Sequence, residues 1–313
     1  MRIYNSPPSS RYHRLKLIAR SHLIRFSLVV PLMILTLNDS ALAQFRSEPL
    51  WTEQTVAAAP DFSPYTADQD SGADADADAD STDAGSLTAC PGEYDPWTDQ
   101  YNVTLSQQSD VNALGNARCN WVRGDLVIRD SSATSLNALA NISRIDGSLI
   151  IVNSGGLTNI DGLVNLTSIG GNLIINANGT LSDILGLQNL RQILGRLKID
   201  NTLLRNLDGL SQLTYVSGDI EIISNGLMTN IDGLQGLNYI SSSLDIQGNA
   251  ALRDLEGLRN ISNVYGSLRV RYNPGLTQLD PLKGLERIWG DLLLIGNTGL
   301  NKCDVLAGIL GWP

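Results

Sequence analysis

Histidine is almost missing from this chain of 313 residues, which has only His13 and His22. Both lie in an N-terminal segment with the composition of a secretory signal, so the mature chain would contain none. This absence excludes Ser-His-Asp triads, histidine general bases and most zinc sites. A Gly-rich phosphate loop before a helix and a CxxC pair are missing too. Carboxylate pairs could still perform acid–base catalysis, but we expect a protein that is not an enzyme and binds no cofactor or metal.

Aromatic residues are also scarce, at 5% of the chain, whereas Leu, Ile, Gly, Asn and Asp are abundant. A core made from such residues must be aliphatic and built from thin layers of similar composition. This composition favours internal repetition as the architecture.

An apolar run long enough to span a membrane is missing, since a spanning helix needs about 20 apolar residues. The uncharged run 26–37 is shorter, follows a basic stretch and precedes Ala41-Leu42-Ala43. The basic residues are Arg2, Arg11, Arg14, Lys16, Arg20 and Arg25. This pattern predicts a secretory signal over residues 1–43, with an uncleaved signal anchor as the alternative, and no transmembrane segment in the mature chain.

Positive charge is scarce after the signal. The whole chain has 22 basic and 32 acidic side chains, of which six basic and one acidic lie in residues 1–43. The remaining 16 basic and 31 acidic side chains give the mature chain a net charge of −15. Repulsion from phosphate backbones and anionic lipid argues against nucleic acid as a partner. Residues 44–88 are rich in Pro, Ala, Ser and Asp and include an Asp-Ala run, so we predict a disordered acidic spacer there.

What the chain does contain is a repeat of 23 or 24 residues. A Gly-x-Leu-x-Ile unit begins at Gly124, Gly147, Gly171, Gly195, Gly218, Ser242, Gly266 and Gly290. The alternation predicts short strands with one face inward, and the Leu residues that follow at spacing three suit a tightly wound return. Because one coil cannot bury its own apolar face, we expect about eight stacked coils, a β-solenoid. Their parallel strands should form one continuous sheet at residues 126–128, 149–151, 173–175, 197–199, 220–222, 244–246, 268–270 and 292–294.

Two polar positions recur with the same period. Asparagines just after the strand predict a ladder that satisfies backbone groups where each coil turns: Asn178, Asn225, Asn249, Asn273 and Asn297. Asp-Gly pairs at 161–162, 208–209 and 232–233 predict a second line of turns. Leu187 should be enclosed by coils on both sides and Leu126 by only the cap below it, so Leu187→Ala should cost more stability.

The start of the repeat resembles the opening of a receptor L domain, the leucine-rich β-solenoid module of insulin- and EGF-receptor ectodomains. The resemblance rests on Cys90-Pro-Gly, Tyr101-Asn-Val-Thr-Leu105, Cys119 and Gly124-Asp-Leu-Val-Ile128 and covers roughly residues 89–313. It implies a right-handed solenoid with an N-terminal disulfide cap, and binding or adhesion at the cell exterior. A Cys90–Cys119 bridge would then tie the cap to the first coil, with two buried free thiols as the alternative. The Cys-rich module, spanning helix and kinase of those receptors are not found in this sequence.

The expected domains are therefore the signal (1–43), the disordered acidic linker (44–88), a disulfide-bonded cap (89–123), the leucine-rich repeats (124–297) and a partial C-terminal cap (298–313). Cys303 occupies the slot of Leu255 and Leu279 in earlier coils. It is either a small core residue or half of a cap bridge whose mate lies beyond Pro313.

Strand alternation also predicts a candidate binding surface on the outer face of the sheet. An apolar patch lies beside a charged central band there, and such patches with polar rims mark binding sites. The candidates are Val127, Ile150, Val152, Ile174, Lys198, Asp200, Glu221, Asp245, Arg269 and Arg271. Alternatively, the β-branched residues serve strand propensity alone, or the spacer folds over them.

A column of acidic residues at one offset could share a divalent ion, although solvent-facing turn caps are the favoured interpretation. It contains Asp208, Asp232, Glu256 and Asp280. Asn-x-Ser/Thr sites at Asn102, Asn141, Asn165, Asn178 and Asn260 would carry glycans only in a eukaryote. The sequence favours a secreted or cell-surface module that binds an extracellular protein or glycan, with a structural component of a cell wall or extracellular matrix as the alternative.

Overall fold

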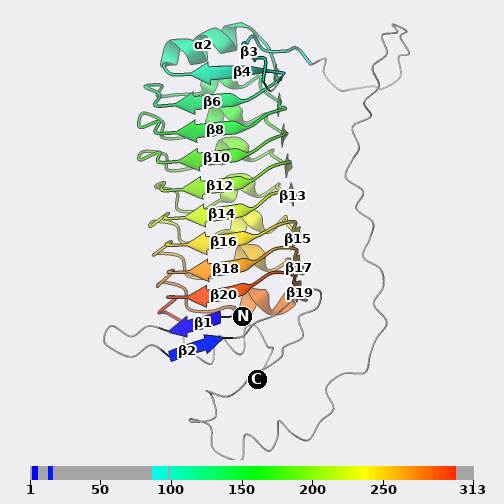
Figure 1. Ribbon diagram of the computed structural model, residues 1–313. Coiled ribbons are helices and arrows are strands. Elements are labelled where there is room, and N and C mark those ends of the chain that lie inside the picture. Colours follow the sequence, from blue (N-terminus) through cyan, green and yellow to red (C-terminus); the bar gives the residue numbers. More distant parts are fainter. Residues whose placement is uncertain (1, 6–12, 17–86, 98, 301–313) are drawn as a thin grey trace, which may run out of the picture. The chain divides into compact units, whose positions relative to one another are not determined.

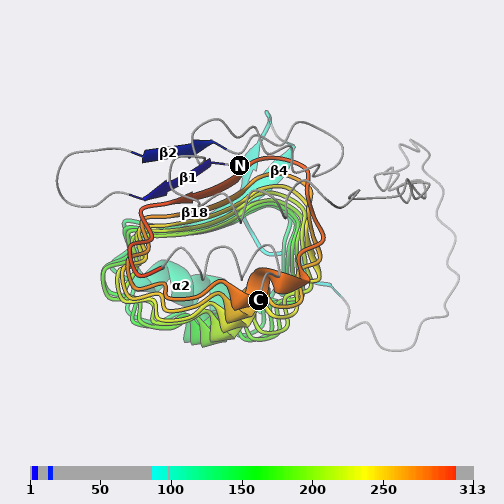
Figure 2. The same cartoon turned by 90° about the horizontal axis from the view of Figure 1, so that it is seen from below.

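The computed structural model describes residues 2–5, 13–16, 87–97 and 99–300 (Figure 1). Residues 100–300 wind into a stack of coils. After the first coil and up to residue 288, each coil consists of a strand in a long sheet, a turn, a 3-10 helix and a two-residue strand on the return. The view along the stack in Figure 2 places the long sheet and the helical turns on opposite sides of each coil. This arrangement is a β-solenoid, as the repeat predicts.

The long sheet contains the strands that the Leu-x-Ile units predict, each one residue longer than expected. These are β6 (Leu126–Arg129), β8 (Leu149–Val152), β10 (Leu173–Asn176), β12 (Leu197–Asp200), β14 (Ile220–Ile223), β16 (Leu244–Gln247), β18 (Leu268–Arg271) and β20 (Leu292–Ile295). They pair in parallel and in sequence order within one 12-stranded sheet, which confirms the predicted continuity. At one end, β4 (Gln100–Leu105) pairs in parallel with β6, and β3 (Glu93–Asp95) pairs antiparallel with β4.

The return of each coil is helical and then extended. Its 3-10 helices are η1 (Asn137–Leu139), η2 (Asp161–Leu163), η3 (Leu185–Leu187), η4 (Asp208–Leu210), η5 (Asp232–Leu234), η6 (Glu256–Leu258) and η7 (Asp280–Gly284). The predicted Asp-Gly turns are the first two residues of η2, η4 and η5.

The two-residue strands form two further sheets. One holds β5 (Trp121–Val122), β7 (Arg144–Ile145), β9 (Ser168–Ile169), β11 (Gln192–Ile193) and β13 (Tyr215–Val216). The other holds β15 (Tyr239–Ile240), β17 (Asn263–Val264) and β19 (Arg287–Ile288). Sequence reasoning did not anticipate these strands, because two residues are too short to show alternation.

The core is aliphatic and runs the length of the stack. Inward strand residues such as Leu173 and Ile175 are fully buried, and the core residues of residues 87–300 include no aromatic side chain. Each layer packs on the layer before and after it, so burial is shared between neighbours rather than gathered around one centre.

A ladder of buried asparagines follows the strands, as predicted. The Asn249 Nδ2 donates to the carbonyl of Ile222 at 2.9 Å, and its Oδ1 accepts the backbone N–H of Asn225 at 3.0 Å. Asn273 and Asn297 repeat both bonds in the next two coils. Each side chain satisfies a carbonyl and an amide that the turn would leave unpaired inside the protein.

Glycine in the 3-10 turns allows successive coils to approach closely. A Cβ on Gly209 would lie 1.9 Å from the carbonyl oxygen of Ile184, and one on Gly233 would lie 1.7 Å from that of Leu207. Both obstacles are backbone atoms, which cannot move aside without separating the coils.

Gly209→Ala should therefore lower the free energy of unfolding by about 1–3 kcal/mol, the usual cost of overpacking a tight site. Gly226→Ala is the matched control, since a Cβ there would meet nothing within 4 Å. Urea unfolding of both variants measures the difference. Equal midpoints would show that the coils are not held at this separation.

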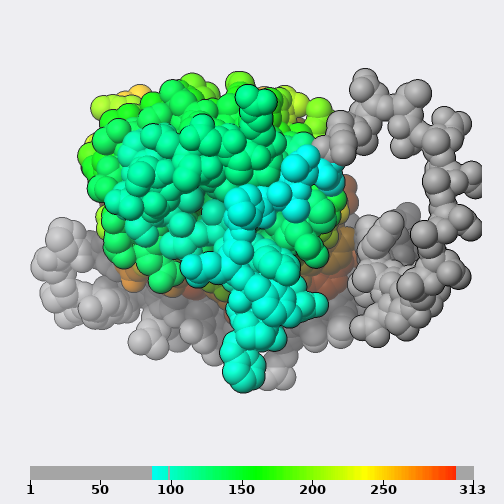
Figure 3. Space-filling view, turned by 90° about the horizontal axis from the view of Figure 1, so that it is seen from above, coloured from blue at the N-terminus to red at the C-terminus, as the bar shows by residue number. Residues whose placement is uncertain are grey.

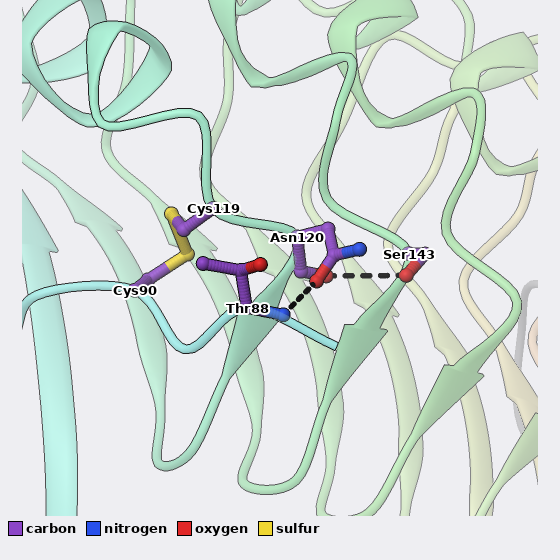
Figure 4. Close-up of a disulfide and its surroundings, with 5 residues drawn as sticks. All are labelled: Thr88, Cys90, Cys119, Asn120 and Ser143. Atoms are coloured by element: carbon purple, nitrogen blue, oxygen red, sulfur yellow. Dashed lines mark hydrogen bonds between the residues drawn. A yellow bond between two sulfur atoms is a disulfide. The ribbon is translucent and has the colours of Figure 1, made fainter. Parts of the chain in front are cut away.

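The N-terminal end of the stack is closed by a cap. Figure 3 shows the cap residues over the end of the stack, where α2 (Gln108–Asn116) buries Val111 and Leu114. The predicted disulfide between Cys90 and Cys119 is confirmed. In Figure 4 it lies beside a hydrogen bond of 2.7 Å from the Thr88 N–H to Asn120 Oδ1. The bridge and this bond together fasten the segment before β3 to the first coil.

Leu126 has the cap below it, as expected, but the cap encloses this side chain completely instead of leaving it less covered than Leu187. β4 continues the long sheet by a full strand, with Val103 beside Leu126 in register. Leu126 and Leu187 are both 0% exposed. Sequence reasoning missed this strand because β4 lacks the Gly-x-Leu-x-Ile unit.

Leu126→Ala and Leu187→Ala should thus have comparable effects, each lowering the free energy of unfolding by about 2–5 kcal/mol. Chemical denaturation of the two variants under the same conditions provides the comparison. A clearly smaller loss for Leu126→Ala would mean that β4 does not enclose the first coil.

Several predictions concern residues outside the described ranges. The spacer is described only at residues 87–88, the C-terminal cap only at residues 298–300, and Cys303 not at all. Within the predicted signal, β1 (Arg2–Asn5) pairs in parallel with β20, and β2 (His13–Lys16) pairs antiparallel with β1. The signal, the spacer and the C-terminal cap stay predictions.

Candidate binding surface

The outer face of the long sheet is the surface on which all the candidate residues lie. Along every strand from β8 to β20, buried residues alternate with half-buried ones in the pattern that the sequence predicts. The strands pair without offset, so equivalent residues line up in two columns across the face. The strand register therefore brings the candidates together as predicted.

The apolar patch occupies the N-terminal part of this face. Val127 pairs with Ile150, and Ile150 with Ile174, in three consecutive strands. Val152 lies in the neighbouring column beside Asn176. All four apolar side chains are half-buried. Their branched side chains stand on adjacent strands and form one continuous apolar area.

The charged band begins on the next strands. Lys198 Nζ lies 3.3 Å from Asp200 Oδ2 and 3.5 Å from Glu221 Oε2. Arg196 extends this network, with its guanidinium 3.4 Å from Glu221 Oε1. Sequence reasoning missed Arg196 because it precedes β12 and takes no part in the alternation. The side chains of Lys198, Asp200 and Glu221 are only 20–24% exposed, so the network is less screened by solvent than an ordinary surface pair.

A second ion pair follows, between Asp245 and Arg271, whose side chains are 16% and 27% exposed. Asp245 Oδ1 and Arg271 Nε are buried and have no hydrogen-bond partner among the described residues. The pair is thus one bond short of the two-bond arrangement that a guanidinium and a carboxylate can make. Arg269 lies beside Asp245 in register but makes no ion pair with a described residue.

The comparison with protein families bears directly on these repeats. The family model described as Receptor L domain matches residues 118–182 and 167–226. Residues 118–226 belong to the receptor L domain family. Receptor L domains are non-enzymatic ligand-binding modules of receptors. Comparisons with curated proteins and with solved structures gave no match.

Two further findings concern the L domain as a whole. In the part of the chain that the structure describes, no helix is both long enough and apolar enough to cross a membrane. Among the same residues, no group of three or more His, Cys, Asp or Glu side chains is arranged to hold a metal ion.

The acidic column lies on the opposite side of the L domain from the long sheet. Asp208, Asp232, Glu256 and Asp280 each begin a 3-10 helix, as turn residues do. Desolvation, followed by the negative charges of Asp254, Asp208 and Glu256, raises the pKa of Asp232. The arrangement fits the turn interpretation.

The Asn-x-Ser/Thr sites are not equivalent. Asn178 is 0% exposed, and its side-chain amide is bonded within the asparagine ladder, so the folded domain cannot accept a glycan there. Asn141, Asn165 and Asn260 are exposed and follow η1, η2 and η6. Glycans at these three positions would leave the sheet face free.

Charge reversal on the sheet face should disturb the ion pair that it breaks. Asp245→Lys places a third cation beside Arg269 and Arg271, and we expect a loss of about 1–2 kcal/mol in the free energy of unfolding. Asp245→Asn removes the charge without adding repulsion and should cost less. Because salt screens repulsion between partly exposed charges, the difference should narrow at high ionic strength. Thermal unfolding of both variants at low and high salt tests this, and a difference independent of salt would contradict it.

Proposed function

We propose that this chain is a non-enzymatic, extracellular or cell-surface binding module that recognises a protein or glycan on the face of its long sheet. The observation that carries the proposal is the composition of that face. A continuous apolar area formed by Val127, Ile150 and Ile174 adjoins a band of internally paired charges on a single rigid sheet. The family supports the same class of function, because receptor L domains bind ligands.

The apolar area and the charged band of the sheet face would contribute differently to binding. Burying the apolar area against a partner supplies affinity, since each Å² of apolar surface removed from water contributes about 25 cal/mol. The paired charges supply selectivity, because a partner must match them or leave them desolvated. Strands fixed on both sides by neighbours hold these groups in place before the ligand arrives, which lowers the entropic cost of binding.

The proposed extracellular location rests on the signal predicted at the N-terminus. The predicted signal over residues 1–43 would deliver the chain to the cell exterior, an oxidising compartment in which the bond between Cys90 and Cys119 persists. The acidic linker over residues 44–88 would then precede the L domain as a solvated spacer. Secretion and the linker are parts of the proposal.

The experiment first captures the partner by chemical cross-linking on the cell surface and then measures its affinity for two variants. Ile150→Asp places a carboxylate in the apolar area, and we expect affinity to fall by at least about tenfold, as for a buried interface anchor. Leu227→Asp is the matched control, since Leu227 is 42% exposed and lies beyond β14, off the sheet face. Equal affinities, with both variants folded, would place the partner elsewhere. Covalent retention in wall material without a saturable partner would favour the structural alternative.

A further inference from the structure

The aromatic residues between residues 87 and 300 lie on the surface of the solenoid and not in its core. Between residues 87 and 300 they are Tyr94, Trp97, Tyr101, Trp121, Tyr215, Tyr239, Tyr265, Tyr272 and Trp289, and none is buried. An aliphatic core explains why aromatic residues are few. It does not explain which parts of the surface carry them. Aromatic side chains in contact with solvent are characteristic of recognition surfaces, where a ring offers a large apolar area with few rotatable bonds.

Most of these rings line one corner of the solenoid. In Figure 1 this corner follows the short strands β13, β15, β17 and β19 along the right-hand edge. Strand register aligns Trp121, through β7, β9 and β11, with Tyr215. Tyr265 and Trp289 directly follow β17 and β19. We call this surface the aromatic edge: Trp121, Tyr215, Tyr239, Tyr265 and Trp289, with Arg123 and Arg287.

The rings of the aromatic edge contact one another from coil to coil. The centroids of Tyr215 and Tyr239 are 6.4 Å apart, and those of Tyr239 and Tyr265 are 6.1 Å apart. Tyr265 and Trp289 are stacked at 4.4 Å. These contacts fix the rings in place, yet Tyr265 is still 41% exposed and the other three are half-buried. The result is a rigid apolar strip that runs along the solenoid axis and stays open to solvent.

Arg287 stacks on the ring at one end of the strip. Arg123 stacks on Trp121 at the far end of the aromatic edge, which three coils that carry Arg144, Ser168 and Gln192 separate from Tyr215. The Arg287 guanidinium lies 5.3 Å from the ring centre of Trp289, and that of Arg123 lies 5.1 Å from Tyr101 and 5.7 Å from Trp121. Neither guanidinium forms an ion pair with a described residue. In a chain with an excess of acidic side chains, two arginines held by rings instead of carboxylates leave their hydrogen-bond donors available for an external anion.

We propose that the aromatic edge binds an extended polysaccharide that carries carboxylate groups. A pyranose ring has apolar C–H groups that pack on aromatic surface, and a polymer of such rings repeats along a line as the strip does. The planar guanidinium matches a carboxylate with two parallel hydrogen bonds, which explains why arginines flank the rings. Arg123 and Arg287 are separated by seven coil steps, on the order of 30 Å at the usual strand spacing. A long polymer can contact both ends, and a short oligosaccharide only one.

This surface is independent of the sheet face. The aromatic edge follows the short strands, whereas Ile150 and Asp245 lie on the long sheet. One L domain could therefore hold a matrix polysaccharide at its edge and a second ligand on its face. The result of a binding test at one surface therefore neither supports nor contradicts the proposal for the other.

The test measures binding of the purified protein to immobilised polygalacturonate, with two comparison polymers. Methyl-esterified polygalacturonate keeps the sugar and loses the charge, and polyglutamate keeps the charge and loses the sugar. We expect saturable binding to polygalacturonate that is at least tenfold tighter than to either comparison polymer. Affinity should increase with polymer length, because simultaneous contact at both ends raises the effective concentration. No saturable binding, or equal binding to polyglutamate, would overturn the proposal.

Variants then assign the site. Arg287→Gln and Arg123→Gln should together weaken binding at least tenfold, with the control Arg205→Gln, an exposed arginine beyond β12, unchanged. Tyr265→Ala should weaken binding. If loss of the stacked ring lowers the melting temperature of this variant, Tyr265→Leu replaces it in the binding measurement. Tyr272→Ala is its control, since Tyr272 is 54% exposed and lies off the edge. Ile150→Asp should leave polygalacturonate binding unchanged. Equal losses in edge variants and controls would refute the site.

Discussion

The fold depends on one constraint: a coil of 23 or 24 residues has an apolar face that only another coil can cover. Stacking satisfies this constraint when every coil has nearly the same path, so that strands pair without offset and inward residues meet inward residues. The asparagine ladder follows from the same requirement. Each coil must turn inside the stack, and a side chain such as Asn249 supplies the hydrogen bonds that the turning backbone lacks. Gly209 meets the same stacking requirement, because a side chain there would hold two coils apart.

The same repetition explains what could be predicted from sequence. Leu173 and Ile175 point inward because alternation has a period of two, and a one-residue shift would have turned both outward. The asparagines and the Asp-Gly turns recur at the repeat length, so their shared role could be read without a structure. The register then placed the ten candidate residues of the sheet face on one side.

Features outside the repeat could not be predicted in this way. β4 has no Gly-x-Leu-x-Ile unit, and so the coil that encloses Leu126 was not apparent. The pairing of Arg196 with Glu221 depends on the reach of long side chains, which alternation does not determine. The aromatic edge did leave a signal, since Tyr215 and Tyr239 are 24 residues apart, as are Tyr265 and Trp289. Tyr239 and Tyr265 occupy two different positions of the repeat, so the contact between their rings could be found only from the geometry of the corner.

The coils contact only their immediate neighbours, which has a consequence for how such a protein can evolve. Duplication or loss of one whole repeat leaves every remaining interface of the same kind, because a Leu-lined layer packs equally well on any other. Each added unit would lengthen the sheet face and the corner by about 4.8 Å, the spacing of paired strands. Surface reach and core stability can therefore change separately. The length of a ligand could select the number of coils without any change in the residues that hold them together.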